Sequence, residues 1–168
     1  MANRLQRILK HRWVDEADTR RAIPPALVDK LAQYVADSER RHTGEIRIYV
    51  EPGLPLSYLW RDARPRERAI AMFGKLGVWD TEQNNGVLIY LLLAEHAIEV
   101  VADRGLARHV APEQWQRIVQ GMGEAFRAGR YEEGLKQAVD AVTAHLVRHF
   151  PAGGQPNPNE LPDAPVLG

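Results

Sequence analysis

The stretch NNGVLIYLLLAEHAIEVVADRG, residues 84–105, decides the fold of this chain. Its first half, Val87–Ala94, is an almost unbroken apolar run with the length of a strand that is buried on both faces. A short polar connection, Glu95–His96, separates this run from a second strand at Ala97–Ala102. The pattern therefore predicts an antiparallel hairpin with a central first strand.

An alternating segment, Glu45–Glu51, precedes the hairpin and predicts a half-buried strand, with Ile46, Ile48 and Val50 on its inner face and Arg47 and Tyr49 on the other. More than thirty residues separate it from Val87–Ala94, with a loop expected at Gly53–Pro65 and a helix at Arg66–Leu76, whose residues Ala69, Ile70 and Phe73 are expected to face inward. A connection of that length favours a parallel βαβ unit. Further helices are expected at the segments 24–41, 112–128 and 131–150, where apolar residues recur at helical spacing. The fold class is therefore α/β.

The chain divides into three parts. Residues 1–23 are expected to hold an amphipathic helix and a linker, and residues 24–150 form the domain itself. Residues 151–168 contain five prolines and three glycines, which predicts an extended or disordered tail that adds little to stability.

The N-terminal segment Asn3–Trp13 carries a stripe of four apolar side chains among basic ones: Leu5, Ile8, Leu9 and Trp13. Such a stripe can pack on the domain, or the helix can lie on an anionic membrane. Because the segment offers only about three helical turns, packing on the domain is the favoured interpretation.

Composition excludes several functions. The 22 basic and 22 acidic residues cancel, which argues against a broad nucleic-acid surface. The absence of cysteine excludes disulfides, thiolate catalysis and cysteine-type zinc sites. No secretory signal or membrane-length apolar run is visible, so a cytoplasmic location is expected. The sequence also lacks a nucleophile elbow, a P-loop, a dinucleotide fingerprint and an HExxH motif.

Polar residues gather where the predicted topology brings strand ends together. The starts of the first two strands and the end of the third share one edge of the sheet, together with the loop 77–83. Carboxylates and side-chain amides there are hard oxygen donors, which suit Ca²⁺ or Mg²⁺ better than zinc or copper. The same segments are also good turn formers, so a purely structural role stays open. The candidates are Glu45, Asp80, Glu82, Asn84, Asn85 and Asp103, with Gly86 and Gly105 allowing close backbone approach.

Three segments together resemble a known family: GEIRIYVE at residues 44–51, LGVWDTEQNNGVLIYLLLAEHAIEVVADRGL at residues 76–106, and the spaced pattern W..I...M...F..GRYEEGLKQAV at residues 115–139. Over about residues 25–150 the chain is similar to the TPM domain. This family includes bacterial proteins, a plant thylakoid-lumen protein and an animal acetylcholine-receptor modulator.

The resemblance implies a three-layer α/β/α sandwich around a small mixed sheet. It also implies binding of a divalent cation, Ca²⁺ or Mg²⁺, and acid-phosphatase activity attributed to the plant members. The matching positions are Asp80, Asn84, Asn85, Asp103 and Arg104. Many members carry a signal peptide and a membrane anchor, which are not visible here. This difference argues against an extracytoplasmic role and leaves open a cytoplasmic protein that attaches to the membrane through a partner or its first helix.

Two functions follow from these expectations. The first is a cation-binding module that helps to assemble or maintain membrane protein complexes. The second is a metal-dependent acid phosphatase of weak activity, in which Arg104 clamps the phosphoryl group. Because the acidic set is thin and no nucleophile is evident, binding is favoured over catalysis. The sequence indicates neither a particular partner nor a substrate nor an oligomeric state.

Overall fold

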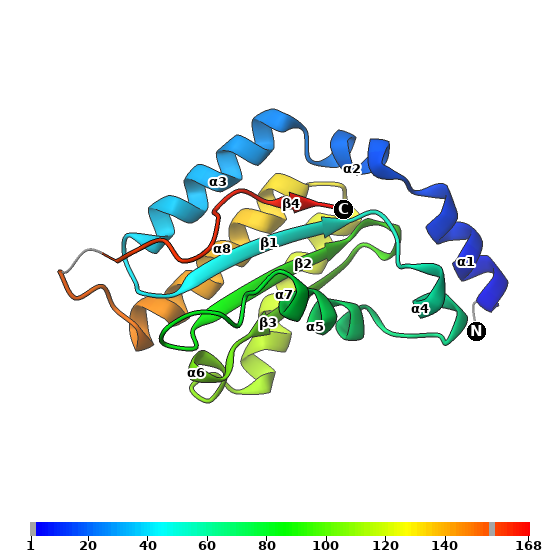
Figure 1. Ribbon diagram of the computed structural model, residues 1–168. Coiled ribbons are helices and arrows are strands. Elements are labelled where there is room, and N and C mark those ends of the chain that lie inside the picture. Colours follow the sequence, from blue (N-terminus) through cyan, green and yellow to red (C-terminus); the bar gives the residue numbers. More distant parts are fainter. Residues whose placement is uncertain (1–2, 155–156) are drawn as a thin grey trace.

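A four-stranded mixed sheet forms the centre of the computed structural model, which describes residues 3–154 and 157–168 (Figure 1). The strands lie in the order β3-β2-β1-β4. Their bounds are β1 Glu45–Glu51, β2 Gly86–Leu92, β3 Ala97–Ala102 and β4 Val166–Leu167.

The predicted βαβ unit and hairpin are both confirmed. β1 and β2 run parallel with Glu45 opposite Gly86, and β2 and β3 run antiparallel with Val87 opposite Ala102. The hairpin connection contains a single 3₁₀ turn, η1 Leu93–Glu95, followed by His96 in the left-handed region with φ of 48°.

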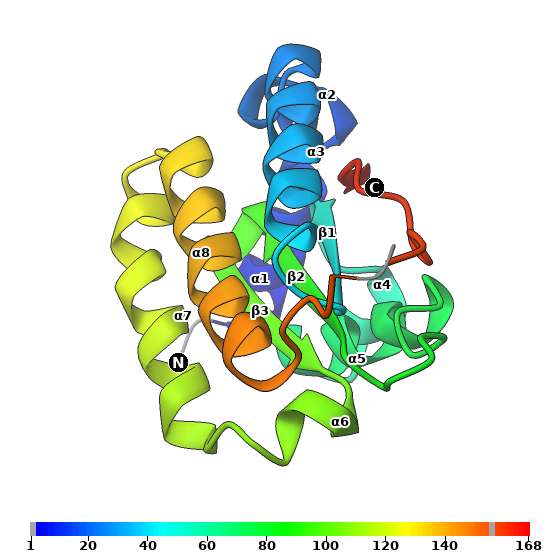
Figure 2. The ribbon, with the colours of Figure 1, turned by 90° about the vertical axis from the view of Figure 1, so that its left-hand side faces the viewer.

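Helices cover both faces of the sheet, so the predicted three-layer sandwich is also confirmed (Figure 2). One face packs against α3, α7 and α8, and the other packs against α4 and α5. Three further helices, α1, α2 and α6, lie outside these layers or join them. The bounds are α1 Arg4–Trp13, α2 Glu16–Ala22, α3 Pro25–Glu39, α4 Leu56–Trp60, α5 Pro65–Lys75, α6 Arg104–Ala107, α7 Pro112–Arg127 and α8 Tyr131–His149.

The double covering explains the unbroken apolar run of β2. Val87 and Ile89 point into the cluster formed with α3, α7 and α8, whereas Leu88 and Tyr90 point into the cluster formed with α4 and α5. Every residue of β2 is buried, as expected for a strand with helices on both faces.

Two predictions about burial were wrong. β1 was expected to be half-buried, but Tyr49 and Glu51, on the side predicted to be exposed, are 5% and 6% exposed. In α5 the inward residues include Arg68 and Met72, while Ile70, which was expected inside, is 53% exposed. The first difference arises because α4, α5 and the tail cover this face of β1. The second arises because Arg68 turns inward to pair with Glu51 beneath α5.

The tail also differs from its prediction. It runs back along the sheet, and Val166 and Leu167 form β4 opposite Tyr49 and Val50 of β1 (Figure 1). Arg47 donates from Nη1 to the carbonyl oxygens of Pro162, at 2.5 Å, and Ala164, at 2.9 Å. The tail therefore docks on the domain, whereas the sequence had suggested that it contributes little.

Deletion of residues 157–168 is expected to lower the free energy of unfolding by roughly 2 kcal/mol and Tm by about 4–8 °C. The deletion removes β4 and leaves the Arg47 guanidinium and the Glu45 carboxylate without their tail partners. Thermal unfolding followed by circular dichroism measures the shift. An unchanged Tm would mean that the docked tail adds no net stability.

Helix α1 forms as predicted, but it does not pack on the domain in the way that was expected. Leu5, Leu9 and Trp13 remain exposed at one end of the molecule, so the interpretation that the apolar stripe packs on the domain was wrong for three of its four residues. Only Ile8 packs against the cluster formed by α4 and α5.

None of the helices within residues 3–154 and 157–168 has the length and apolar character that a membrane-crossing segment needs.

Candidate functional site

The predicted convergence of strand ends is present at one edge of the sheet. Glu45 at the start of β1 lies opposite Gly86 at the start of β2. The ladder between β2 and β3 extends one step further, because the Asp103 N–H donates to the Gly86 carbonyl oxygen at 2.9 Å. Segments far apart in the sequence are thus adjacent here.

Two glycines hold this edge together tightly. A side chain at Gly86 would collide with the carbonyl oxygen of Val78, and one at Gly105 would collide with those of Gln83 and Asn84. The Gly105 N–H also donates to the Asn84 carbonyl oxygen at 2.8 Å. The loop before β2 therefore lies directly against the turn that follows β3, with no room for a side chain between them.

The backbone is strained in the loop before β2, which forms part of this edge. Asn84 has a φ of 52°, in the left-handed region that only glycine occupies without cost and that asparagine tolerates better than most residues. Such conformations persist where the surrounding structure enforces them, and they cluster at functional sites.

Asp103 has one carboxylate oxygen that is satisfied and one that is not. Its Oδ1 accepts the N–H of Arg104 at 2.7 Å, at the start of α6. Its Oδ2 is buried and has no hydrogen-bond partner within the described part of the chain. A buried carboxylate oxygen without a donor is costly unless a ligand or an ordered water compensates it.

Asn85 is fully buried beside this edge. Its Nδ2 donates to Thr43 Oγ1 at 3.2 Å, and its N–H donates to Thr81 Oγ1 at 3.1 Å. Its Oδ1, like the Asp103 oxygen, lacks a partner among residues 3–154 and 157–168. The side chain thus ties the start of β2 to the segment before β1.

Of the other candidate side chains, Glu45 is engaged away from Asp103. The Glu45 oxygens accept the N–H groups of Glu160 and Leu161, each at 3.2 Å, so this carboxylate holds the tail. Burial raises the pKa of Glu45 to about 7, against the lowering effect of these two hydrogen bonds. Asp80 and Arg104 are exposed. Across the described residues, no three acidic or histidine side chains are grouped in a way that could hold a metal ion.

The edge can therefore offer a limited set of oxygen ligands. It provides one buried carboxylate oxygen, a close-packed set of backbone carbonyls and the side chains of the loop before β2. This donor chemistry suits a hard cation that keeps several waters. It provides neither the nucleophile nor the pair of metal-bridging carboxylates that strong phosphatases use.

An acidic recess on the other side of Glu45 was not predicted. Glu39 at the end of α3 is 8% exposed, and its Oε1 accepts the Ile46 N–H at 2.8 Å. Burial, together with the neighbouring Glu45 and Asp163, raises the pKa of Glu39 to about 9. No sequence signal marks this recess, because Asp163 arrives from the tail, more than a hundred residues away.

A buried ion pair at the opposite end of β1 was also missed. Arg68 contacts Glu51 through Nε and Nη2, with the shortest distance 2.6 Å, and Tyr90 donates to Glu51 Oε2 at 2.7 Å. Tyr49 adds a donor at 3.2 Å, and burial raises its pKa to about 12. Every group is satisfied from within the protein, so this cluster serves the fold.

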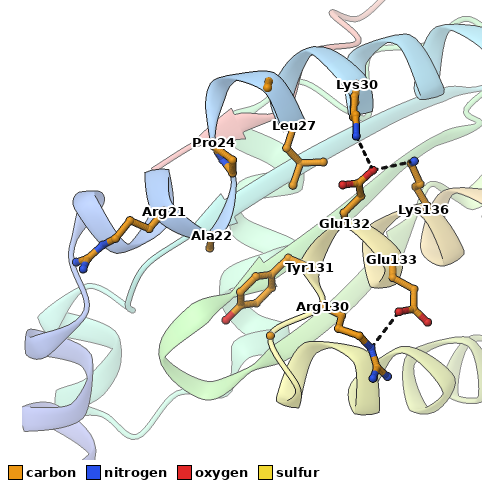
Figure 3. A pocket seen from close by; sticks show the side chains of 12 residues that line it. Arg21, Ala22, Pro24, Leu27, Lys30, Arg130, Tyr131, Glu132, Glu133 and Lys136 are labelled. Carbon is orange, nitrogen blue, oxygen red and sulfur yellow. Dashed lines mark hydrogen bonds and ion pairs between the residues drawn. The ribbon is translucent and has the colours of Figure 1, made fainter.

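A recess of about 770 Å³ lies elsewhere, between the start of α3 and the start of α8 (Figure 3). All of its charged side chains take part in ion pairs, and most of these pairs lie within the lining. Lys30 and Lys136 both bond Glu132, at 3.2 and 3.0 Å, and Arg130 bonds Glu133 at 3.0 Å. Its charged side chains are therefore already engaged in ion pairs within the protein.

The comparisons with known proteins agree with this architecture. A solved structure of the BA42 protein from the psychrophilic bacterium Bizionia argentinensis superposes with a TM-score of 0.72 at 24% identity, covering 83% of this chain and 91% of that one. The N-terminal domain of a protein from P. gingivalis superposes with a TM-score of 0.60 at 22% identity, covering 83% and 94%. At these identities the likeness shows the fold alone. A comparison with curated proteins gave no match.

The family model of the TPM domain matches residues 17–145, which is most of the chain and includes all four segments that meet at the sheet edge. The chain therefore belongs to the TPM domain family.

Proposed function

We propose that this protein is a divalent-cation-binding module and that Asp103 is the central ligand of Ca²⁺ or Mg²⁺. The observation that carries the proposal is the buried Asp103 Oδ2, which has no hydrogen-bond donor within the described residues. A hard cation at this oxygen would offset the cost of burying it.

The remaining ligands would come from the loop before β2. Gly105 brings the carbonyl oxygens of Gln83 and Asn84 against the turn that contains Asp103, and Asp80 lies on the same loop. Waters would complete a six- to eight-coordinate shell, as is common for calcium. Glu45 is a weaker candidate than its position suggested, because both of its oxygens accept hydrogen bonds from the tail.

Binding without turnover is the role that this donor set supports best. The TPM domain family includes a modulator of a membrane receptor, so we propose that the cation-loaded domain helps to assemble or maintain a membrane protein complex. The physical basis would be the ordering of the two loops by the shared ion, which fixes the surface that a partner meets.

Titration of Ca²⁺ or Mg²⁺ is expected to shift the amide resonances of residues 80–86 and 103–105 together. Thermal stability should rise by mass action, by about 2.7 kcal/mol at a hundred times Kd. Asp103→Asn should weaken binding at least tenfold, because it removes the negative charge but retains the shape and an effective helix-capping oxygen. NMR and thermal shift assays measure both effects.

Asp29→Asn is the matched control, since it removes the same charge from an exposed position on α3. It should leave the affinity unchanged. Equal losses in the two variants, or amide shifts confined to the tail, would contradict a site at the sheet edge.

The phosphatase alternative is tested on the same samples. Arg104 is exposed next to Asp103, where it could reach a phosphoryl group held by the cation. We expect the wild type to show no cation-dependent hydrolysis of a phosphate monoester above background. Hydrolysis that Asp103→Asn and Arg104→Ala each abolish, while the Arg104 variant still binds the cation, would establish the enzyme instead.

A further inference from the structure

The helix α1 is attached to the domain through its polar side. Arg7 donates to Glu95 at 2.7 Å, to Asp62 at 2.8 Å and to the Ala63 carbonyl oxygen at 2.8 Å. His11 is 4% exposed and lies 2.8 Å from the same Glu95 oxygen. A long-range ionic network therefore anchors the helix.

This network fixes the orientation of the helix. The Leu54 N–H donates to His11 Nδ1 at 3.0 Å, so Nε2 carries the proton that faces Glu95. Although burial opposes it, hydrogen bonds from His11 and Arg7 hold the pKa of Glu95 below its ordinary value. Arg7 and His11, on one side of α1, are thus bound to the domain.

The opposite side of α1 is apolar and faces solvent. Leu5, Leu9 and Trp13 follow one another at four-residue spacing, and they are 64%, 59% and 82% exposed. A surface helix ordinarily buries its apolar stripe and exposes its charges. Here the apolar stripe is exposed, and Arg7 and His11 face the domain instead. The stripe is therefore available to a partner or surface outside the domain.

The charges beside the stripe indicate what covers it. Arg4, Lys10 and Arg12 are exposed, and none of them forms an ion pair within the described part of the chain. The helix RLQRILKHRW contains no acidic residue. The surface therefore combines exposed apolar side chains with unneutralised positive charge, which is the pattern of helices that lie on anionic lipid.

Nearby acidic groups do not cancel this charge. Asp15 and Asp18 form the capping box of α2, and Asp18 also pairs with Arg21 at 2.7 Å. Glu16 pairs with Arg20 at 3.3 Å within the same helix. Two more exposed apolar side chains, Leu56 and Trp60, lie on α4, the short helix that packs against α1 (Figure 1).

We propose that α1 docks this domain on an anionic lipid bilayer, with Leu5, Leu9 and Trp13 inserted at the headgroup boundary and Arg4, Lys10 and Arg12 against lipid phosphates. Because the domain already holds α1 folded, lipid need not supply the cost of helix formation that limits short peptides. The docking does not depend on cation binding at the sheet edge.

Vesicle sedimentation with the full chain tests this proposal. The wild type should bind vesicles that contain about a third anionic phosphatidylglycerol. It should bind much less to vesicles of pure phosphatidylcholine. Replacing Leu5, Leu9 and Trp13 with serine should weaken binding roughly tenfold per side chain, in proportion to the apolar area that lipid buries. Replacing Arg4, Lys10 and Arg12 with glutamine should cost roughly fivefold per charge, and only on anionic vesicles.

The matched control is Ile70→Ser, because Ile70 is a 53% exposed apolar side chain on a different helix, α5. Its binding should equal that of the wild type, and unchanged circular dichroism should accompany every variant. Wild type that fails to sediment with anionic vesicles would overturn the proposal, as would an equal loss in Ile70→Ser. A wild-type dimer that the triple serine variant converts to a monomer would assign α1 to a second copy of the chain instead.

Discussion

Glu51→Gln is expected to lower the free energy of unfolding by about 3–5 kcal/mol, because it leaves the Arg68 guanidinium buried without a counter-charge. The ion pair is 2.6 Å long, and the side chains of Arg68 and Glu51 are 11% and 7% exposed. Glu51 also accepts the hydroxyl groups of Tyr49 and Tyr90, so a single carboxylate satisfies three donor side chains. Urea denaturation at neutral pH measures the loss.

A surface pair in the same protein supplies the control. Arg66 and Glu99 lie 3.4 Å apart with side chains that are 48% and 24% exposed. Glu99→Gln should therefore cost less than about 1 kcal/mol. A double-mutant cycle with Arg68→Met should return a coupling energy above roughly 2 kcal/mol for Glu51. Similar losses for Glu51→Gln and Glu99→Gln would show that burial of the first pair carries no special cost.

The sheet could be predicted from the sequence because its signals are local. The apolar run 87–94 and the alternation in 45–51 each give strand position within a few residues, and the length between them gives the parallel crossover. Convergence of Glu45, Gly86 and Asp103 at one edge then follows from topology alone.

The directions of side chains at that edge could not be predicted. The sequence correctly placed Glu45 at the start of the first strand, but its carboxylate bonds to the tail. The path of the tail in turn depends on the pairing of the two-residue strand β4 with β1. Composition indicated only that residues 151–168 could not fold alone, and the domain supplies the missing partner.

The same limit explains the misassigned faces of two helices. In α5 the apolar Ile70 is exposed while Arg68 is buried, because Arg68 pairs with Glu51. Glu51 lies seventeen residues away in the sequence, so the local pattern of α5 does not reveal this pairing. In α1 the domain-facing side is chosen by Glu95, which is more than eighty residues away. Helical periodicity identifies a stripe, but long-range ion pairs decide which stripe faces inward.

Stability is expected to fall as pH rises above neutrality, and Glu39 accounts for much of the change. Burial raises the pKa of Glu39 from its ordinary value near 4.5 to about 9 in the folded protein. Between those values the folded state binds a proton that the unfolded state has released, so the contribution of Glu39 to stability is greatest at low pH and is lost as pH approaches 9. One such group gives a slope of about 1.4 kcal/mol per pH unit.

The range from pH 7 to 8.5 isolates this effect. Glu45, with a pKa of about 7, loses its contribution mainly below that range. His42 is buried, which lowers its pKa to about 4, so its contribution is complete above pH 6.5 and is lost only on acidification.

Glu39→Gln should remove the slope between pH 7 and 8.5, because glutamine does not ionise and its Oε1 can still accept the Ile46 N–H. The variant should therefore equal or exceed the wild type in stability at pH 8.5, although it loses a carboxylate. Urea denaturation across this range measures the slope, and Glu113→Gln at an exposed position of α7 should leave it unchanged. If the wild-type curve is flat, or if Glu39→Gln retains its slope, then Glu39 is already ionised at neutral pH. In that case a positive group, such as the neighbouring Arg40 or a bound cation, must compensate its charge in the recess that it shares with Glu45 and Asp163.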